Sequence, residues 1–166
     1  MSKKLIIAGG SGTIGKLLID HLQDRFQEIV VLSRSSDRQE DGYRIAQWDA
    51  KNLGSWTKEI EGAELIINLT GKSIETRFTE ENKKILTSSR VDSTRAIGEA
   101  IKASTAPPEI WLNASGAAIY PSTTDTPNDE SITATGTGFK ARLSILWEQT
   151  MNDFNLEKTR TVALRI

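Results

Sequence analysis

The feature that most limits the fold is a strand–turn–helix pattern near the N-terminus. A short apolar run at Leu5–Ala8 predicts a strand. Glycines follow at positions 9, 12 and 15, and then apolar residues at helical spacing: Ile14, Leu17, Leu18 and Leu22. The start of a helix leaves backbone N–H groups unpaired, and a glycine lets the backbone come close to a phosphate because no Cβ intervenes. The segment therefore predicts a phosphate-binding turn.

Two alternatives to a dinucleotide-binding turn stay open from the spacing G-x-x-G-x-x-G. The first is a glycine-rich turn with no ligand. The second is the phosphate loop of nucleotide triphosphatases, because Gly10–Lys16 matches G-x-x-x-x-G-K. The next residue is Leu17, however, where that loop needs a serine or threonine to hold magnesium. We therefore favour the dinucleotide-binding turn.

Composition excludes several other classes of function. The net charge of −1 offers no electrostatic basis for binding nucleic acid or an anionic membrane, and no apolar segment is long enough to span a bilayer. The chain has no cysteine, so it has no disulfide, thiol nucleophile or thiolate metal site. We expect a cytoplasmic protein with a small-molecule substrate and no metal site, and we leave its oligomeric state open.

The second predicted strand bears on the choice of cofactor. It runs through Ile29–Leu32 and ends in Ser33 and Arg34. In a dinucleotide-binding fold an acidic residue at this strand end binds the ribose 2′-hydroxyl of NAD, whereas an arginine accommodates the 2′-phosphate of NADP. Because Arg34 is present and no acid is, the sequence favours NADP(H).

Further strands alternate with helical patterns along the chain. We predict a loop at 35–42 and then strands at 43–48, 64–69, 109–115 and 161–166. Asp49 follows the third strand and either contacts adenine or caps a helix at about 54–60, and both readings stay open. Thr70 and Gly71 follow the fourth strand, where small residues let the backbone approach the cofactor. This alternation predicts an α/β fold of the Rossmann type: a three-layer αβα sandwich around a doubly wound parallel sheet in the order 3-2-1-4-5-6.

The longest predicted helix, at about 79–104, carries an arginine on its apolar stripe. The stripe runs at steps of three and four through Leu86, Arg90, Thr94, Ile97 and Ile101. A buried arginine is costly unless it is paired, so Arg90 predicts either a carboxylate partner or a cofactor phosphate. The single histidine, His21, lies away from the strand ends and is expected to be structural or on the surface.

The fifth strand supplies the candidate catalytic residues. Ser115 ends this strand, at the edge where open α/β sheets bind ligands, and Tyr120 follows shortly after it. Ser115, together with Tyr120, is a candidate for polarising a carbonyl or hydroxyl group of the substrate. The polar segment at 122–137 predicts a long mobile loop near this crevice.

These segments together resemble the epimerase-like branch of the atypical extended short-chain dehydrogenases/reductases. The similarity rests on AGGSGTIG at 8–15, LSR at 32–34, INLTGKSI at 67–74, RFTEENKKILTSSRVDSTRAIGEAI at 77–101, ASGAAIYP at 114–121, Phe139 with the Trp147-Glu148 pair, and the LRI at 164–166. It covers nearly the whole chain, and the segment 77–101 is its most specific part. The resemblance implies an NADP(H)-binding Rossmann domain with a smaller substrate domain.

Carried over residue by residue, the resemblance implies that the cofactor is contacted by Gly9, Ser11, Gly12, Thr13, Ile14, Gly15, Ser33, Arg34, Leu69, Thr70 and Arg90. Members of this family are longer than this chain. We therefore expect residues 1–166 to be the cofactor domain of a longer protein, without most of its substrate domain.

Two functions remain after this comparison. The wider superfamily uses Tyr-x-x-x-Lys on the helix after the catalytic serine, but the corresponding region here, at 137–142, has no tyrosine. One function is an NADP(H)-dependent oxidoreductase or epimerase acting on a small polar substrate such as a sugar nucleotide. The other is an NADP(H)-binding regulatory module with little or no turnover.

Overall fold

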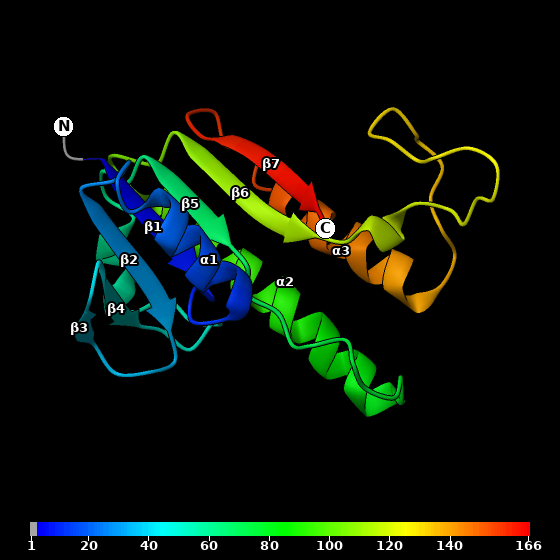
Figure 1. The fold of residues 1–166 in the computed structure, drawn as a ribbon, viewed down its shortest axis with the longest axis horizontal. Coiled ribbons are helices and arrows are strands. Elements are labelled where there is room, and N and C mark those ends of the chain that lie inside the picture. The colour runs from blue at the N-terminus through cyan, green and yellow to red at the C-terminus, as the bar shows by residue number, and fades with distance from the viewer. Residues whose placement is uncertain (1–2) are drawn as a thin grey trace.

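The computed structural model describes residues 3–166 and has one sheet at its centre (Figure 1). Seven strands form the sheet in the order β3-β4-β2-β1-β5-β6-β7. Their bounds are Lys4–Ala8 for β1, Glu28–Ser33 for β2, Arg38–Glu40 for β3, Tyr43–Gln47 for β4, Leu65–Asn68 for β5, Ile110–Ser115 for β6 and Arg160–Arg165 for β7. All neighbouring strands pair in parallel except β3, which pairs antiparallel with β4.

The predicted order of the parallel strands is confirmed. Without β3 the sheet reads β4-β2-β1-β5-β6-β7, which corresponds to the expected 3-2-1-4-5-6. The expected loop at 35–42 is instead part of a hairpin, in which β3 turns back onto β4 through Asp41 and Gly42. Gly42 has a φ of 78°, in the left-handed region that favours glycine.

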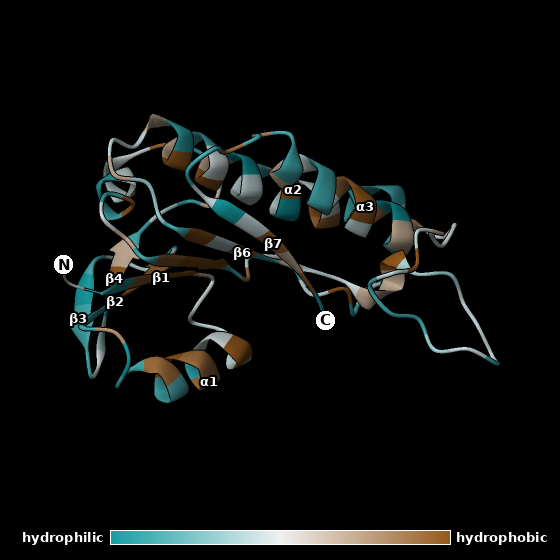
Figure 2. Cartoon of the chain, turned by 90° about the horizontal axis from the view of Figure 1, so that it is seen from above, coloured by the Kyte–Doolittle hydropathy of each residue, from teal (hydrophilic) through white to brown (hydrophobic). Residues whose placement is uncertain are grey.

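Helices cover both faces of the sheet, which confirms the three-layer sandwich (Figure 2). Helix α1, Thr13–Leu22, lies on one face, and α2, Glu80–Ala103, and α3, Phe139–Asn152, lie on the other. Two short 3-10 helices, η1 at Ser55–Glu59 and η2 at Ala117–Ile119, complete the regular elements. Within residues 3–166, no helix is long and apolar enough to cross a membrane.

The two faces of the sheet have separate apolar cores, because alternate residues of a strand point to opposite faces. On the α1 side, Ile7, Val31 and Ile67 pack with Ile19 of the helix. On the other side, strand residues such as Ile6, Val30 and Ile66 pack against η1, α2 and α3, with Trp111 and Ile97 fully buried.

Helix α2 begins as its sequence predicts. Thr79 is the N-cap, and its hydroxyl accepts a hydrogen bond from the Asn82 amide at 3.2 Å. Glu80 and Glu81 occupy the first turn, where negative charge is favourable. The predicted stripe faces the sheet, since Leu86, Thr94, Ile97 and Ile101 are all buried.

The predicted apolar stripe of α1 is wrong in part. Leu17 and Ile14 are 65% and 48% exposed, whereas Gly15 and Ile19 are buried. The reason is steric: a Cβ on Gly15 would lie 2.4 Å from the backbone of Gly10, so the helix contacts the turn that precedes it through Gly15. This contact, and not hydrophobicity alone, sets which side of α1 faces the sheet.

We therefore expect Gly15→Ala to destabilise the fold. Helix propensity alone favours alanine inside a helix by about 1 kcal/mol, but the contact with Gly10 should reverse the sign and cost about 1–3 kcal/mol. The measurement is the free energy of unfolding in urea. Gly12→Ala is the matched control, because a Cβ there meets its nearest atom at an ordinary 3.6 Å. A Gly15→Ala variant as stable as the natural chain would contradict the packing account.

Candidate functional site

The candidate site lies where the parallel strands end. Parallel strands bring their carboxyl ends to the same edge of a sheet, and open α/β sheets bind ligands in the crevice outside these ends. The segments that follow these ends carry the predicted site residues: Gly9–Gly15 after β1, Arg34 after β2, Asp49 after β4, Leu69–Gly71 after β5 and Tyr120 after β6.

The glycine turn packs against the end of β5. Gly9 has a φ of 76°, and a Cβ there would lie 3.2 Å from the backbone of Leu69 and Thr70. The turn leads into α1, whose N-cap is Gly12. No side chain caps this helix and its first turn holds no acid, so its N-terminal amides and the positive end of its dipole remain available to an anion.

Arg34 and Asp49, both predicted to lie at the adenosine part of the cofactor, line the same cavity. This cavity has a volume of about 460 Å³, and its other lining residues include Trp48, Asn52 and Trp56. The two indole rings pack edge to face with centroids 5.2 Å apart. Arg34 is exposed, while Ser33 is buried and its hydroxyl accepts a hydrogen bond from the Ser35 amide at 3.3 Å.

Asp49 does not cap η1, so the helix-capping role, one of the two predicted for it, is wrong. The N-cap of η1 is Gly54, without a side-chain hydrogen bond. Instead, the Asp49 carboxylate accepts hydrogen bonds from the Asn52 amide at 2.7 Å and the Lys51 amide at 2.9 Å. These bonds, the one from Asn52 first, lower the pKa of Asp49 and keep it ionised at neutral pH.

Thr70 carries a buried hydroxyl that lacks a partner. Its Oγ1 has no hydrogen bond within residues 3–166, whereas its amide donates to Asn68 Oδ1 at 3.0 Å. A buried polar group without a partner is costly, so its presence beside the glycine turn is consistent with a ligand that supplies one. Leu69 contributes backbone here, its amide donating to the carbonyl of Ala8.

Arg90 lies against Gly71, the residue that follows Thr70. A Cβ on Gly71 would be 3.2 Å from the Arg90 guanidinium carbon. Arg90 makes no ion pair in the described part of the chain, and its Nη1 donates to the carbonyls of Lys72 and Leu86, both at 3.1 Å. Burial lowers the pKa of Arg90, although the group stays protonated. The predicted carboxylate partner of Arg90 is therefore not found within residues 3–166, and the cofactor phosphate stays a prediction.

Ser115 and Tyr120 are not in direct contact but are joined through two residues that the sequence analysis missed. The Ser115 hydroxyl donates to Glu148 Oε1 at 2.6 Å. Arg165 donates to both oxygens of Glu148 at 2.9 Å, and its Nη1 donates to the Tyr120 hydroxyl at 2.8 Å. Glu148 lies on the buried side of α3, and Arg165 ends β7. Both are charged residues within apolar sequence patterns, and this was the signal by which they could have been recognised as site residues.

This network opposes the effect of burial on Glu148. Burial alone would raise the pKa of the carboxyl, but the hydrogen bonds from Arg165 and Ser115 and the charge of Arg165 together bring the pKa below its ordinary value. Glu148 is therefore a carboxylate at neutral pH, and it accepts the single proton of Ser115.

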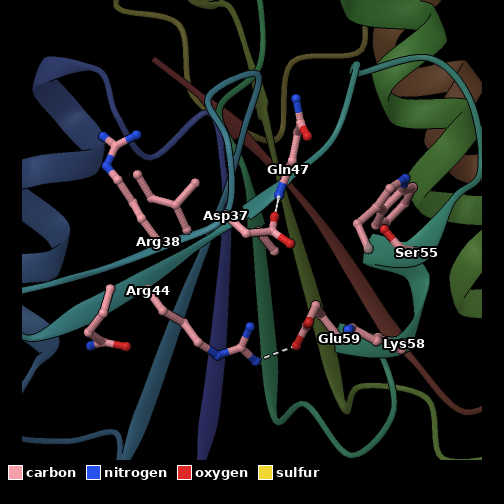
Figure 3. Close-up of a pocket in the computed structure, with 11 residues that line it drawn as sticks. Asp37, Arg38, Arg44, Gln47, Ser55, Lys58 and Glu59 are labelled. Carbon is pink, nitrogen blue, oxygen red and sulfur yellow. Dashed lines mark hydrogen bonds and ion pairs between the residues drawn. The ribbon is translucent and has the colours of Figure 1, made fainter.

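A second cavity of about 300 Å³ adjoins the first one beside the β3–β4 hairpin (Figure 3). Most of its charged side chains are paired: Arg44 binds Glu59 and Glu28, and Arg38 binds Glu40, whereas Lys58 makes no ion pair within residues 3–166. The Asp37 carboxylate accepts a hydrogen bond from the Gln47 amide at 2.6 Å. The exposed Lys58 therefore leaves a cation available at this cavity. Elsewhere in residues 3–166, no cluster of three histidine or acidic side chains is placed to hold a metal ion.

Comparison with known proteins identifies the family. The model for the NAD dependent epimerase/dehydratase family matches residues 5–142. The chain belongs to this family. A curated relative, the epimerase family protein SH2119 of Staphylococcus haemolyticus, is 28% identical over 160 residues, which is 96% of this chain and 53% of the relative. The chain thus spans about half the length of the curated relatives it matches.

Solved structures give the same result. The human epimerase family protein SDR39U1 (isoform 2), solved with NADPH, has a TM-score of 0.77 and 27% identity, covering 98% of this chain and 52% of that one. A UDP-glucuronic acid 4-epimerase from Bacillus cereus, solved with UDP-glucuronic acid and NAD, has a TM-score of 0.79 but only 13% identity, covering 98% of this chain and 55% of that one. This second likeness supports the fold alone.

We expect Glu148→Gln to lower the stability by about 3 kcal/mol at neutral pH, because it leaves Arg165 without its carboxylate. A carboxyl with a lowered folded pKa stabilises the fold above its unfolded pKa of about 4.3, and that contribution is lost as the pH falls through the folded value. The difference between the natural chain and the variant should therefore shrink in acid.

Chemical denaturation at a series of pH values measures this difference. Glu99→Gln is the control, since Glu99 is exposed and makes no ion pair in the described structure. A Glu148→Gln deficit that is absent at neutral pH, or that grows in acid, would contradict the assigned role of Glu148.

Proposed function

We propose that this chain is the NADP(H)-binding domain of an epimerase-type oxidoreductase. The observation that carries the proposal is the meeting of three features at one sheet edge: the uncapped N-terminus of α1 behind its glycine turn, the cavity lined by Arg34, and the unpaired hydroxyl of Thr70 near Arg90. Each matches a different part of a dinucleotide. The relative solved with NADPH supports the same cofactor.

The chain's own groups suggest how such a cofactor would be held. The amides of Thr13, Ile14 and Gly15 would bind the pyrophosphate, with Gly9 and Gly12 allowing its close approach and Ser11 lying in the same turn. Trp48 and Trp56 would face the adenine, and Asp49 would lie near its edge. When bound, NADP(H) supplies or takes up a hydride.

The preference for NADP(H) over NAD(H) is assigned to Arg34. No acid stands at the end of β2, where it would repel a 2′-phosphate, and the exposed guanidinium is free to bind one. Ser33 supports the turn that presents Arg34, through its hydrogen bond to the Ser35 amide.

We expect Arg34→Asp to remove this preference. The natural chain should bind NADPH more tightly than NADH, and the variant should lose about 10-fold or more in NADPH affinity with little change for NADH. Titration calorimetry with both cofactors measures this effect. Arg25→Asp is the control, because Arg25 is exposed after the end of α1, at the opposite edge of the sheet. Equal affinity of the natural chain for both cofactors would exclude the assignment.

The bonding around Ser115 and Tyr120 suggests unequal catalytic roles. Ser115 donates its only proton to Glu148, so its oxygen is left as an acceptor and does not polarise a carbonyl. The Tyr120 oxygen accepts a bond from Arg165, which leaves the phenol proton available to a substrate. Tyr120 is thus the proposed proton donor and acceptor, with a small polar molecule such as a sugar nucleotide as the proposed substrate.

The hydrogen bond between Ser115 and Glu148 also supports a second candidate function. A regulatory module that binds NADP(H) without turnover is favoured by the commitment of the Ser115 proton to Glu148 and by the lack of Tyr-x-x-x-Lys at 137–142. Catalysis is proposed only for a longer protein, because relatives extend to about twice this length and the far wall of the crevice has to come from elsewhere.

Turnover by a longer protein that contains this domain separates the two functions. With NADP(H) and a panel of sugar nucleotides, we expect a new product, and we expect Tyr120→Phe to lower its rate about 100-fold while leaving NADPH affinity unchanged. Tyr43→Phe is the matched control, since Tyr43 lies at the start of β4, away from the carboxyl ends of the strands where the site lies. NADPH binding without any product would favour the regulatory module.

A further inference from the structure

The Arg90 guanidinium is half-buried, without a carboxylate in the described part of the chain to balance its charge. A half-buried guanidinium needs compensation for the water it has lost, and a carboxylate is the usual source. Within residues 3–166 no carboxylate pairs with Arg90, and its two hydrogen bonds go to backbone carbonyls through Nη1 alone. Something else must hold the cation beside Gly71 before a ligand arrives.

The ring of Trp147 is placed to do this. Trp147 lies on α3 and is 6% exposed, and the guanidinium carbon of Arg90 is 5.0 Å from the centroid of its ring. An indole is the strongest aromatic partner for a cation, and the attraction grows when water is excluded.

Hydrogen bonds fix the orientation of this ring. The indole N–H donates to Thr94 Oγ1 at 2.9 Å, and Asn68 Nδ2 donates to the same oxygen at 3.2 Å. Asn68 also donates to Asn113 Oδ1 at 2.7 Å, and its own Oδ1 accepts from the Thr70 amide at 3.0 Å. The contacts of Arg90 and of Thr70 are therefore parts of one buried network that joins α2, α3, β5 and β6.

The choice of a ring over a carboxylate has a chemical consequence. A carboxylate would accept hydrogen bonds from the guanidinium N–H groups and occupy them. A ring attracts the cation through its π electrons, so Nε and Nη2, which have no acceptor in the described structure, keep their donors. Such donors suit the phosphate or ribose oxygens of a dinucleotide.

We propose that Trp147 is a positioning residue for the cofactor, holding Arg90 beside Thr70 and Gly71 with its Nε and Nη2 donors free. The inference rests on the proposed NADP(H) function and names a residue that acts on the cofactor only through Arg90. It also assigns Thr94 the task of keeping the indole ring in place.

The test compares Trp147→Phe, Trp147→Leu and Arg90→Ala by NADPH titration and by the melting temperature without ligand. Affinity should fall in the order Trp, Phe, Leu, with Leu about 3- to 20-fold weaker than the natural chain. Leu146→Ala, a change of an exposed neighbour on α3, is the control and should keep the natural affinity. A purely structural role would instead make affinity follow the melting temperature.

A double-mutant cycle isolates the coupling. If Trp147 acts through Arg90, the variant with both Arg90→Ala and Trp147→Leu should bind NADPH no more weakly than Arg90→Ala alone. Additive losses would overturn the inference. Should the Leu variant fail to fold, the same cycle is measured with Trp147→Phe, and a coupling of zero there overturns the inference equally.

Failure of the function and failure of the inference give different results. Absence of NADPH binding by the natural chain removes both. A natural chain that binds NADPH, with loss in Arg90→Ala but none in either Trp147 variant, removes only the role of Trp147 and leaves the cofactor site as proposed.

Discussion

The buried hydrogen bonds around Asn68 hold together the edge of the sheet on which the proposed site depends. Asn68 and Asn113 are paired residues of adjacent strands, and both are almost fully buried. Their amides, with Thr94 and Trp147, satisfy one another in a region where an unpaired polar group would be costly. Because the groups come from β5, β6, α2 and α3, the network fixes how these elements meet.

The position of this network explains why the candidate cofactor contacts converge. The Thr70 amide bonds to Asn68, which leaves the Thr70 hydroxyl available to a ligand. Arg90 packs over the Trp147 ring, which leaves its Nε and Nη2 donors available to a ligand. On the other side of Gly9, the contact of Gly15 with Gly10 brings the N-terminus of α1 to the same edge. Rigid packing thus places several donors around one crevice before any ligand binds, which reduces the cost of binding.

The parallel sheet could be predicted well from the sequence, because five of its six parallel strands are apolar runs between turn residues. Such runs can be recognised from neighbouring residues alone. The sequence pattern did not predict β3, whose three residues are polar and of which Arg38 and Gln39 are exposed, although the Asp41-Gly42 pair was a usable hairpin signal. It misplaced the exposed side of α1 because hydrophobic spacing takes no account of the Gly15 contact. The partners of Ser115 and Arg90 are 33 and 57 residues away in sequence, and spacing patterns carry no information on such contacts.

Amide chemical-shift mapping of the isotope-labelled chain during NADPH titration shows where the cofactor binds without requiring a substrate. The largest shifts should fall on the amides of Thr13, Ile14 and Gly15, on Arg34, and on Thr70 and Gly71, all at the edge where the parallel strands end. Shifts centred on the cavity beside the β3–β4 hairpin, or no shifts at NADPH concentrations that saturate its relatives, would contradict the proposed cofactor site.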